Sequence, residues 1–156
     1  MKVQLISVGT QMPSWVKEGY SEYAKRLTQD ILLELVEIET KKRGKNANIP
    51  QIQRFEEKQL LAEAKKCDLV IALDPKGKPW STEQLSQRFQ DWQNLGHHRI
   101  GLLVGGPEGL TDACRQQADL LWSLSPLTFP HPLVRVIVAE QIYRAWTITK
   151  SHPYHR

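Results

Sequence analysis

The chain has 156 residues, a length typical of one domain with its own hydrophobic core. Hydrophobic residues make up 40% and charged residues 24% of the sequence, and no apolar run approaches the roughly 18 residues of a membrane-spanning helix. A membrane-spanning protein is therefore not expected. The formal net charge of +4 mildly favours a polyanionic partner.

The N-terminal stretch and the cysteines indicate the compartment. Residues 3–8 are too few, and with Gln4 and Ser7 too polar, for the apolar segment of a secretory signal. Cys67 and Cys114 lie far apart and outside any CxxC motif, which is typical of thiols in a reducing environment. We expect a cytoplasmic protein without a metal site.

Strand-like and helix-like segments alternate along the chain. Apolar runs of strand length cover residues 3–8, 32–38, 69–73, 100–104 and 120–124. Helical spacing covers residues 15–27, 49–64, 85–92, 110–118 and 132–149, and Ser81 with Gln84 fits a capping box for the third helix. This order predicts a single α/β domain over residues 1–156, with a mainly parallel sheet and helices on both faces.

The last predicted helix, residues 132–149, has the broadest apolar face of the chain. Its apolar positions cover more of the helix than one sheet face could bury, and Tyr143 and Trp146 are aromatic residues of the kind enriched at interfaces. A second copy of the chain could cover the remainder, so we expect a homodimer.

In parallel α/β sheets, ligands bind at the carboxyl ends of the strands. After the fourth predicted strand the chain reads Gly105-Gly106-Pro107-Glu108-Gly109, where three glycines permit either a tight turn or a close approach to a ligand. The pattern lacks the spacing of G-x-G-x-x-G and of a P-loop, so a phosphate cradle is not expected.

Two further loops follow strands. Residues 124–132 contain three prolines, and such a stiff, extended segment could hold a flat ring through its backbone or act as a rigid connector. Residues 74–80 have the composition of a loop, and Trp80 could cover the core.

Basic residues gather in two places. Lys41, Lys42, Arg43 and Lys45 form one cluster, and the C-terminal tail directly follows the most apolar helix. The tail side chains can transfer protons or pair with phosphate, although chain ends often fray; they are His152, Tyr154, His155 and Arg156.

Several motifs together resemble the SPOUT-class methyltransferases of large-subunit ribosomal RNA, from one end of the chain to the other. They are Lys42-Arg43-Gly44-Lys45-Asn46, Gly77-Lys78-Pro79-Trp80, the glycine loop 105–109, Leu124-Ser125 with Thr128, His131-Pro132-Leu133-Val134-Arg135, Glu140-Gln141, Tyr143-Arg144-Ala145 and His152-Pro153-Tyr154-His155-Arg156.

The resemblance implies an α/β knot fold with a deep C-terminal trefoil knot, through which two chains dimerise. It also implies S-adenosylmethionine as cofactor and methylation of N3 of a pseudouridine in 23S ribosomal RNA, on assembled ribosomes. The implied donor site comprises Leu73, Gly105, Gly106, Leu124, Ser125, Pro126, Leu127, Thr128 and Phe129. The implied catalytic residues are His152, Tyr154, His155 and Arg156, and the implied RNA contacts are Lys41, Lys42, Arg43, Lys45 and Arg135.

Other functions stay open at this point. A related enzyme could act on transfer RNA, and an RNA-binding ribosome factor without catalysis would need only the basic cluster. A generic nucleotide-binding domain is disfavoured by the missing phosphate loop. The sequence leaves undecided which tail residue is the base, and whether the tail serves its own chain or its partner.

Overall fold

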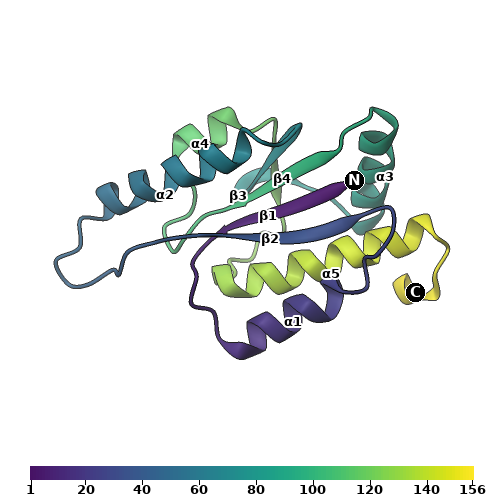
Figure 1. Cartoon of the computed structure of the whole chain (residues 1–156), viewed down its shortest axis with the longest axis horizontal. Helices are drawn as coiled ribbons and strands as arrows, with labels where there is room; N and C mark the ends of the chain where they lie inside the picture. The colour runs from purple at the N-terminus through teal and green to yellow at the C-terminus, as the bar shows by residue number, and fades with distance from the viewer.

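A five-stranded sheet runs through the centre of the protein in the computed structural model, which describes residues 1–156 (Figure 1). The strands are β1 (Lys2–Val8), β2 (Leu32–Ile38), β3 (Leu69–Pro79), β4 (Arg99–Val104) and β5 (Leu120–Ser123). Their order is β2-β1-β4-β3-β5, and all neighbouring strands are parallel, which confirms the predicted sheet.

Helices cover both faces of this sheet, as predicted (Figure 1). They are α1 (Ser14–Ala24), α2 (Ile49–Ala64), α3 (Thr82–Asn94), α4 (Asp112–Gln117) and α5 (His131–Thr149), followed by the 3₁₀ helix η1 (Pro153–His155). Helices α1, α3 and α5 pack on one face, and α2 and α4 pack on the other. No helix combines the length and the apolar character that crossing a membrane requires.

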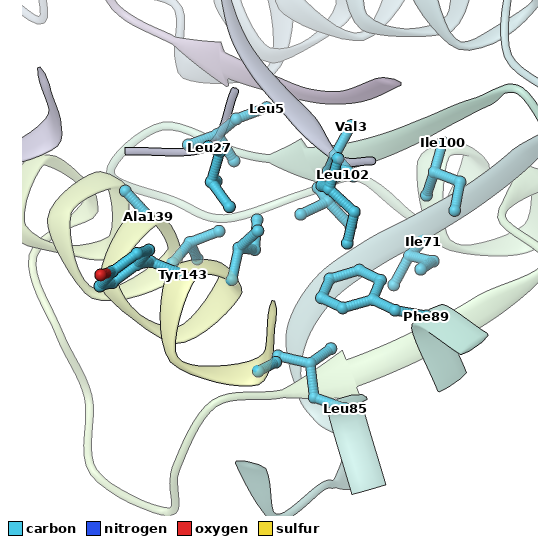
Figure 2. Close-up of a cluster of buried hydrophobic side chains, with 14 of the residues drawn as sticks. Val3, Leu5, Leu27, Ile71, Leu85, Phe89, Ile100, Leu102, Ala139 and Tyr143 are labelled. Carbon is cyan, nitrogen blue, oxygen red and sulfur yellow. The ribbon is translucent and has the colours of Figure 1, made fainter. Parts of the chain in front are cut away.

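Alternating side chains of β1 supply both halves of the core. Val3 and Leu5 point toward α3 and α5, whereas Ile6 and Val8 belong to the cluster under α2 and α4. Figure 2 shows the larger cluster, in which Phe89 of α3 lies near the strand residues. A parallel sheet buried on both faces needs such apolar strands, which explains why the strand predictions hold.

The broad apolar face of α5 is buried largely within one chain. Helix α5 packs between α1 and α3 as well as on the sheet, and Val138, Ala139, Ile142 and Ala145 are fully buried there. This accounts for most of the width that we attributed to a second copy. The width of the α5 face therefore no longer supports a dimer by itself.

Local capping fixes several helix starts. The predicted capping box is confirmed, since Gln84 N donates to Ser81 Oγ at 3.0 Å and Ser81 N donates to Gln84 Oε1 at 2.8 Å. The side chain of Asn48 accepts a hydrogen bond from Gln51 N at 3.2 Å, so α2 begins at Ile49 as predicted.

The predicted loop at residues 74–80 is wrong in part, because β3 continues to Pro79. After a register shift, Lys78 and Pro79 pair with β5. A Cβ atom on Gly77 would lie 2.6 Å from the carbonyl carbon of Leu121, so only glycine permits this close crossing. Trp80 then stacks on Trp122, with ring centroids 5.0 Å apart, and covers the core.

Candidate active site

A cavity with a volume of about 1140 Å³ lies beside residues 73–76 of β3 and the carboxyl ends of β4 and β5. Three segments that are distant in sequence form its wall: residues 73–76 of β3, the glycine loop after β4, and the segment after β5. The implied donor residues that line it are Leu73, Gly105, Gly106, Leu124, Ser125, Leu127, Thr128 and Phe129. Pro126 is not among the lining residues, so the structure does not bring it to the wall.

The glycine loop is a tight turn that also forms one side of the cavity. Gly109 N donates to the Gly106 carbonyl at 2.9 Å, and Gly109 has a φ of +81°. A Cβ atom on Gly105 would lie 2.5 Å from the carbonyl carbon of Gly109, which leaves no space for a side chain. The tight-turn interpretation is confirmed, and the same turn forms part of the cavity wall, while the close approach to a ligand stays a prediction.

The segment after β5 is held by its serines. Ser123 Oγ donates to the Ser125 carbonyl at 3.2 Å, and Leu127 N donates to Ser125 Oγ at 3.0 Å. The Leu127 side chain is 70% exposed and gives the cavity an apolar rim.

Charged residues that the sequence analysis did not single out also line the cavity. Arg115 Nη1 lies 3.1 Å from Asp74 Oδ2 and donates to the Leu110 carbonyl at 2.6 Å. Asp74 follows directly after the apolar part of β3, and this position could have identified it as a residue of the site. Nothing in the sequence distinguished Arg115 from an exposed residue of α4.

His131, the first residue of α5, also lines the cavity. Burial, followed by the positive charges of Arg135 and Arg43, lowers the pKa of His131. Its Nδ1 is buried and has no hydrogen-bond partner. A neutral imidazole therefore stands at the start of α5, and the sequence analysis used it only as part of a motif.

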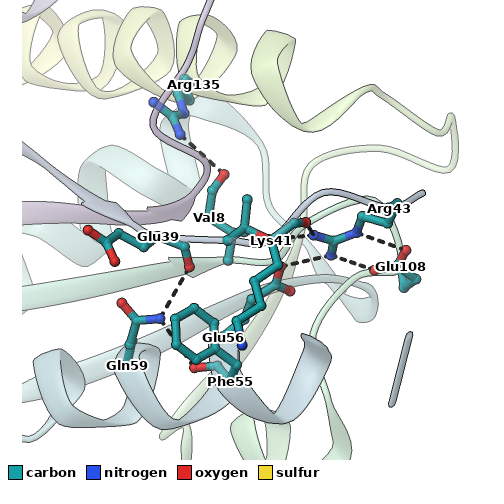
Figure 3. A network of polar contacts seen from close by, with 10 residues as sticks. Val8, Glu39, Lys41, Arg43, Phe55, Glu56, Gln59, Glu108 and Arg135 are labelled. Carbon is teal, nitrogen blue, oxygen red and sulfur yellow. Dashed lines mark hydrogen bonds and ion pairs between the residues drawn. The ribbon is translucent and has the colours of Figure 1, made fainter. Parts of the chain in front are cut away.

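Arg43 of the basic cluster is held by two carboxylates (Figure 3). Its Nη2 lies 2.7 Å from both Glu56 Oε2 and Glu108 Oε1, and its side chain is 19% exposed. The two carboxylates compete with RNA phosphates for this guanidinium, and the RNA contact of Arg43 stays a prediction. The neighbouring residues Lys42 and Lys45 are exposed.

The predicted RNA contact of Arg135 is wrong, because its side chain is only 1% exposed. Its guanidinium donates to Glu37 Oε2 at 2.8 Å, Ser7 Oγ at 3.2 Å and the Gly9 carbonyl at 2.7 Å. Arg135 therefore ties α5 to the carboxyl end of β1 from within the core. From the sequence we expected Arg135 to be exposed, because its polar partners lie about 100 residues or more earlier in the chain and no local pattern reveals them.

The C-terminal tail folds back onto α5. The Tyr154 ring lies 4.7 Å from that of Tyr143, and its hydroxyl donates to Glu140 Oε1 at 3.1 Å. Burial, followed by Tyr23 and Glu140, raises the pKa of Tyr154 to about 12. Tyr154 is thus protonated at neutral pH and poorly suited to act as a base.

The remaining tail residues differ in exposure. His152 and Arg156 are exposed, whereas His155 is half-buried, with an Nδ1 that lacks a partner. None of the four predicted catalytic residues lines the cavity. The tail follows the far end of α5 but folds back along it (Figure 1). The Tyr154 hydroxyl reaches Glu140, nine residues after His131, which at about 1.5 Å per residue is roughly 14 Å along the helix from its cavity-lining start.

Comparison with known proteins identifies the family. The family model described as "Predicted SPOUT methyltransferase" matches residues 1–155. The chain is 57% identical over 156 residues to "Ribosomal RNA large subunit methyltransferase H" of Thioalkalivibrio sulfidiphilus (strain HL-EbGR7), covering 100% of this chain and 99% of the relative.

Solved structures share the fold at low sequence identity. A probable methylase family protein from Haemophilus influenzae Rd KW20 has a TM-score of 0.59 and 11% identity, covering 99% of this chain and 70% of that one. A probable methyltransferase from Bordetella pertussis Tohama I gives 0.56 and 12%, with coverages of 92% and 95%. The Legionella pneumophila methyltransferase Lpg2936, described as a complex with bound cofactor SAM, gives 0.50 and 11%, with coverages of 94% and 66%. The chain belongs to the SPOUT methyltransferase family, and with it to the α/β knot fold that the sequence predicts.

Proposed function

We propose that the protein transfers the methyl group of S-adenosylmethionine to N3 of a pseudouridine in 23S ribosomal RNA, on assembled ribosomes in the cytoplasm. The observation that carries this proposal is the full-length identity of 57% to a relative named as a ribosomal RNA large subunit methyltransferase. The cavity at the strand ends supplies a site of suitable size and chemistry for the donor.

The cavity has room for S-adenosylmethionine and a lining that suits its adenine ring. Its volume of about 1140 Å³ is slightly above the roughly 300–1000 Å³ of typical ligand pockets. Leu73, Leu127 and Phe129 offer apolar contact for the adenine ring of the donor. The glycine loop brings backbone N–H and C=O groups to the cavity wall.

When bound, the cofactor supplies a sulfonium methyl group as the electrophile. The protein must then hold the acceptor nitrogen in line and exclude water, which is mainly positioning. The acceptor N–H must also lose its proton, and a positioned base typically contributes about 10² to 10⁴ in rate. With Tyr154 protonated, His152 and His155 are the tail residues that could take this proton.

The distance between cavity and tail supports a homodimeric site. None of the tail residues lines the cavity of its own chain, so we infer that the tail of a second copy completes the site. Arg156 and the exposed residues Lys41, Lys42 and Lys45 would then contact RNA phosphates, which sets orientation rather than sequence preference.

The proposal is tested on ribosomes and, in a separate reaction, on transfer RNA, both from a strain that lacks this gene. Each is incubated with the protein and isotope-labelled S-adenosylmethionine, and the digested 23S RNA and transfer RNA are analysed by mass spectrometry. We expect one labelled methyl group, on N3 of a pseudouridine. Label found only in transfer RNA would contradict the substrate, and no calorimetric binding of S-adenosylmethionine would contradict the enzymatic function.

A further inference from the structure

Arg43 connects three separate segments beside the cavity (Figure 3). Besides the contact from Nη2, its Nε donates to Glu108 Oε2 at 3.3 Å, so both carboxylate oxygens of Glu108 are engaged. The same Nη2 lies 2.7 Å from Glu56 of α2, and Nη1 donates to the Lys41 carbonyl at 3.1 Å. One guanidinium thus joins the glycine loop, helix α2 and its own segment.

The α2 end of this connection is firmly placed. The Glu56 side chain is 4% exposed and also accepts a hydrogen bond from Thr40 Oγ1. A buried carboxylate without a partner is costly, so Glu56 favours keeping the guanidinium in place. On the loop side, the hydrogen bond from Arg43 lowers the pKa of Glu108, which stays ionised and paired.

The glycine loop has few internal contacts of its own. Within residues 105–109 the backbone contributes the bond from Gly109 N to the Gly106 carbonyl, and glycines have little intrinsic preference for one conformation. Arg43 meets this loop a second time, because a Cβ atom on Gly106 would lie 3.1 Å from its Nη2. The guanidinium therefore packs against the Gly106 backbone while it binds Glu108.

We propose that Arg43 is a positioning residue that holds the Gly105–Gly109 loop in its donor-binding conformation through Glu108, with Glu56 as its anchor. This assignment rests on the proposed function in one respect, namely that the donor binds in the cavity beside the loop. Arg43 itself does not touch the donor. It acts on donor affinity by reducing the number of conformations open to the loop before the donor binds.

The test is a double-mutant cycle with Arg43→Gln, Glu108→Gln and the double variant, read by calorimetric titration with S-adenosylmethionine. We expect each single change to weaken donor binding about tenfold, as loss of a charge-assisted contact does, and the double change to weaken it no further. Arg54→Gln is the matched control, because Arg54 is an exposed arginine of the same helix as Glu56. Its donor affinity should equal that of the wild type.

A second measurement reads the loop without any donor. Amide hydrogen exchange at residues 105–110 should be faster in Arg43→Gln and in Glu108→Gln than in Arg54→Gln. Unchanged exchange and unchanged donor affinity in folded Arg43→Gln would overturn the assignment, as would additive effects in the cycle. If the wild type fails to bind S-adenosylmethionine while loop exchange responds as expected, the proposed function fails but the loop-holding role of Arg43 stands.

Discussion

Gly105 and Gly106 are neighbours in sequence, but Gly105 packs against backbone and Gly106 packs against side chains. A Cβ atom on Gly105 would meet the Gly109 backbone at 2.5 Å, whereas one on Gly106 would meet side chains, at 3.1 Å from Arg43 and 3.3 Å from Val8. Backbone in a tight turn cannot move aside without opening the turn, while an arginine side chain can shift by a few tenths of an ångström.

Gly105→Ala should therefore reduce affinity for S-adenosylmethionine by about tenfold or more, because the turn that lines the cavity must open. Gly106→Ala should have a smaller effect. Gly44→Ala is the control, since its Cβ atom would meet nothing within 4 Å. Calorimetric titration of folded variants measures all three, and wild-type affinity in Gly105→Ala would contradict the role of this turn.

Arg135 is charged, but its role is structural, because it joins α5 to the end of β1 and to β2 inside the core. Replacing it with Met removes the donors that Ser7, Glu37 and the Gly9 carbonyl share, and we expect a loss of about 2–4 kcal/mol in the free energy of unfolding. Urea denaturation measures this loss. Arg54→Met, at an exposed position, should change stability by no more than about 0.5 kcal/mol. Unchanged stability with weaker RNA binding in Arg135→Met would restore a phosphate contact.

Among the elements, η1 shows how a chain end becomes ordered. Tyr154 packs on Tyr143, its hydroxyl binds Glu140, and the Arg144 guanidinium lies 4.9 Å from the centre of its ring. The aromatic ring, the carboxylate and the cation together hold the tail against α5. All three partners belong to the adjacent helix α5, so the tail is placed on the face of the sheet that carries α1, α3 and α5.

Docking of the tail should depend on pH through Tyr154. Its pKa is raised from 10.0 to about 12, so the folded hydroxyl stays protonated at pH values where the unfolded chain has ionised. The stabilisation is fully present below pH 10 and is lost as the pH rises toward 12. The stability difference between wild type and Tyr154→Phe should be constant from pH 7 to 9 and shrink at pH 11. The ionisation of the other tyrosines affects both proteins equally and cancels in this difference. A stability difference at pH 11 equal to that at pH 7 would be inconsistent with the raised pKa of Tyr154.

The elements also show which features the sequence could predict. The bounds of α2 follow from Asn48 and from helical spacing, both of which are local. The extension of β3 past Asp74 escaped prediction because its residues favour turns, and it pairs only once β5 lies beside it. In the site, the strand-end rule located the cavity walls, whereas the partners of Arg43 and Arg135 lie too far along the chain for a pattern to reveal.

At the scale of the whole molecule, cavity and tail lie at opposite ends of α5 (Figure 1). The start of this helix reaches the cavity through His131, and its other end carries the predicted catalytic tail. The apolar rim at Leu127 is 70% exposed in the single chain and is available for contact with a second copy. An isologous dimer whose twofold axis passes between the cavity and the tail would bring the cavity of each chain toward the tail of the other.

Mixed dimers test whether two chains share each site. One partner carries Gly105→Val, whose larger side chain has no space beside the Gly109 backbone and should abolish donor binding, and the other lacks residues 152–156, which removes the tail. Each homodimer should be inactive, but a mixed dimer with shared sites contains one intact cavity facing one intact tail. Its methylation rate should return to about half that of the wild type, because one of two sites is complete.

The control is a mixed dimer of wild type with a chain that carries both changes. If sites are shared, each of its two sites lacks either a cavity or a tail, so this dimer should be inactive. If each chain instead uses its own tail, the control dimer keeps one complete site, and the dimer of the two single variants keeps none. The two arrangements thus predict opposite activities for the same pair of samples, once sedimentation and mass analysis have verified that the dimers are mixed.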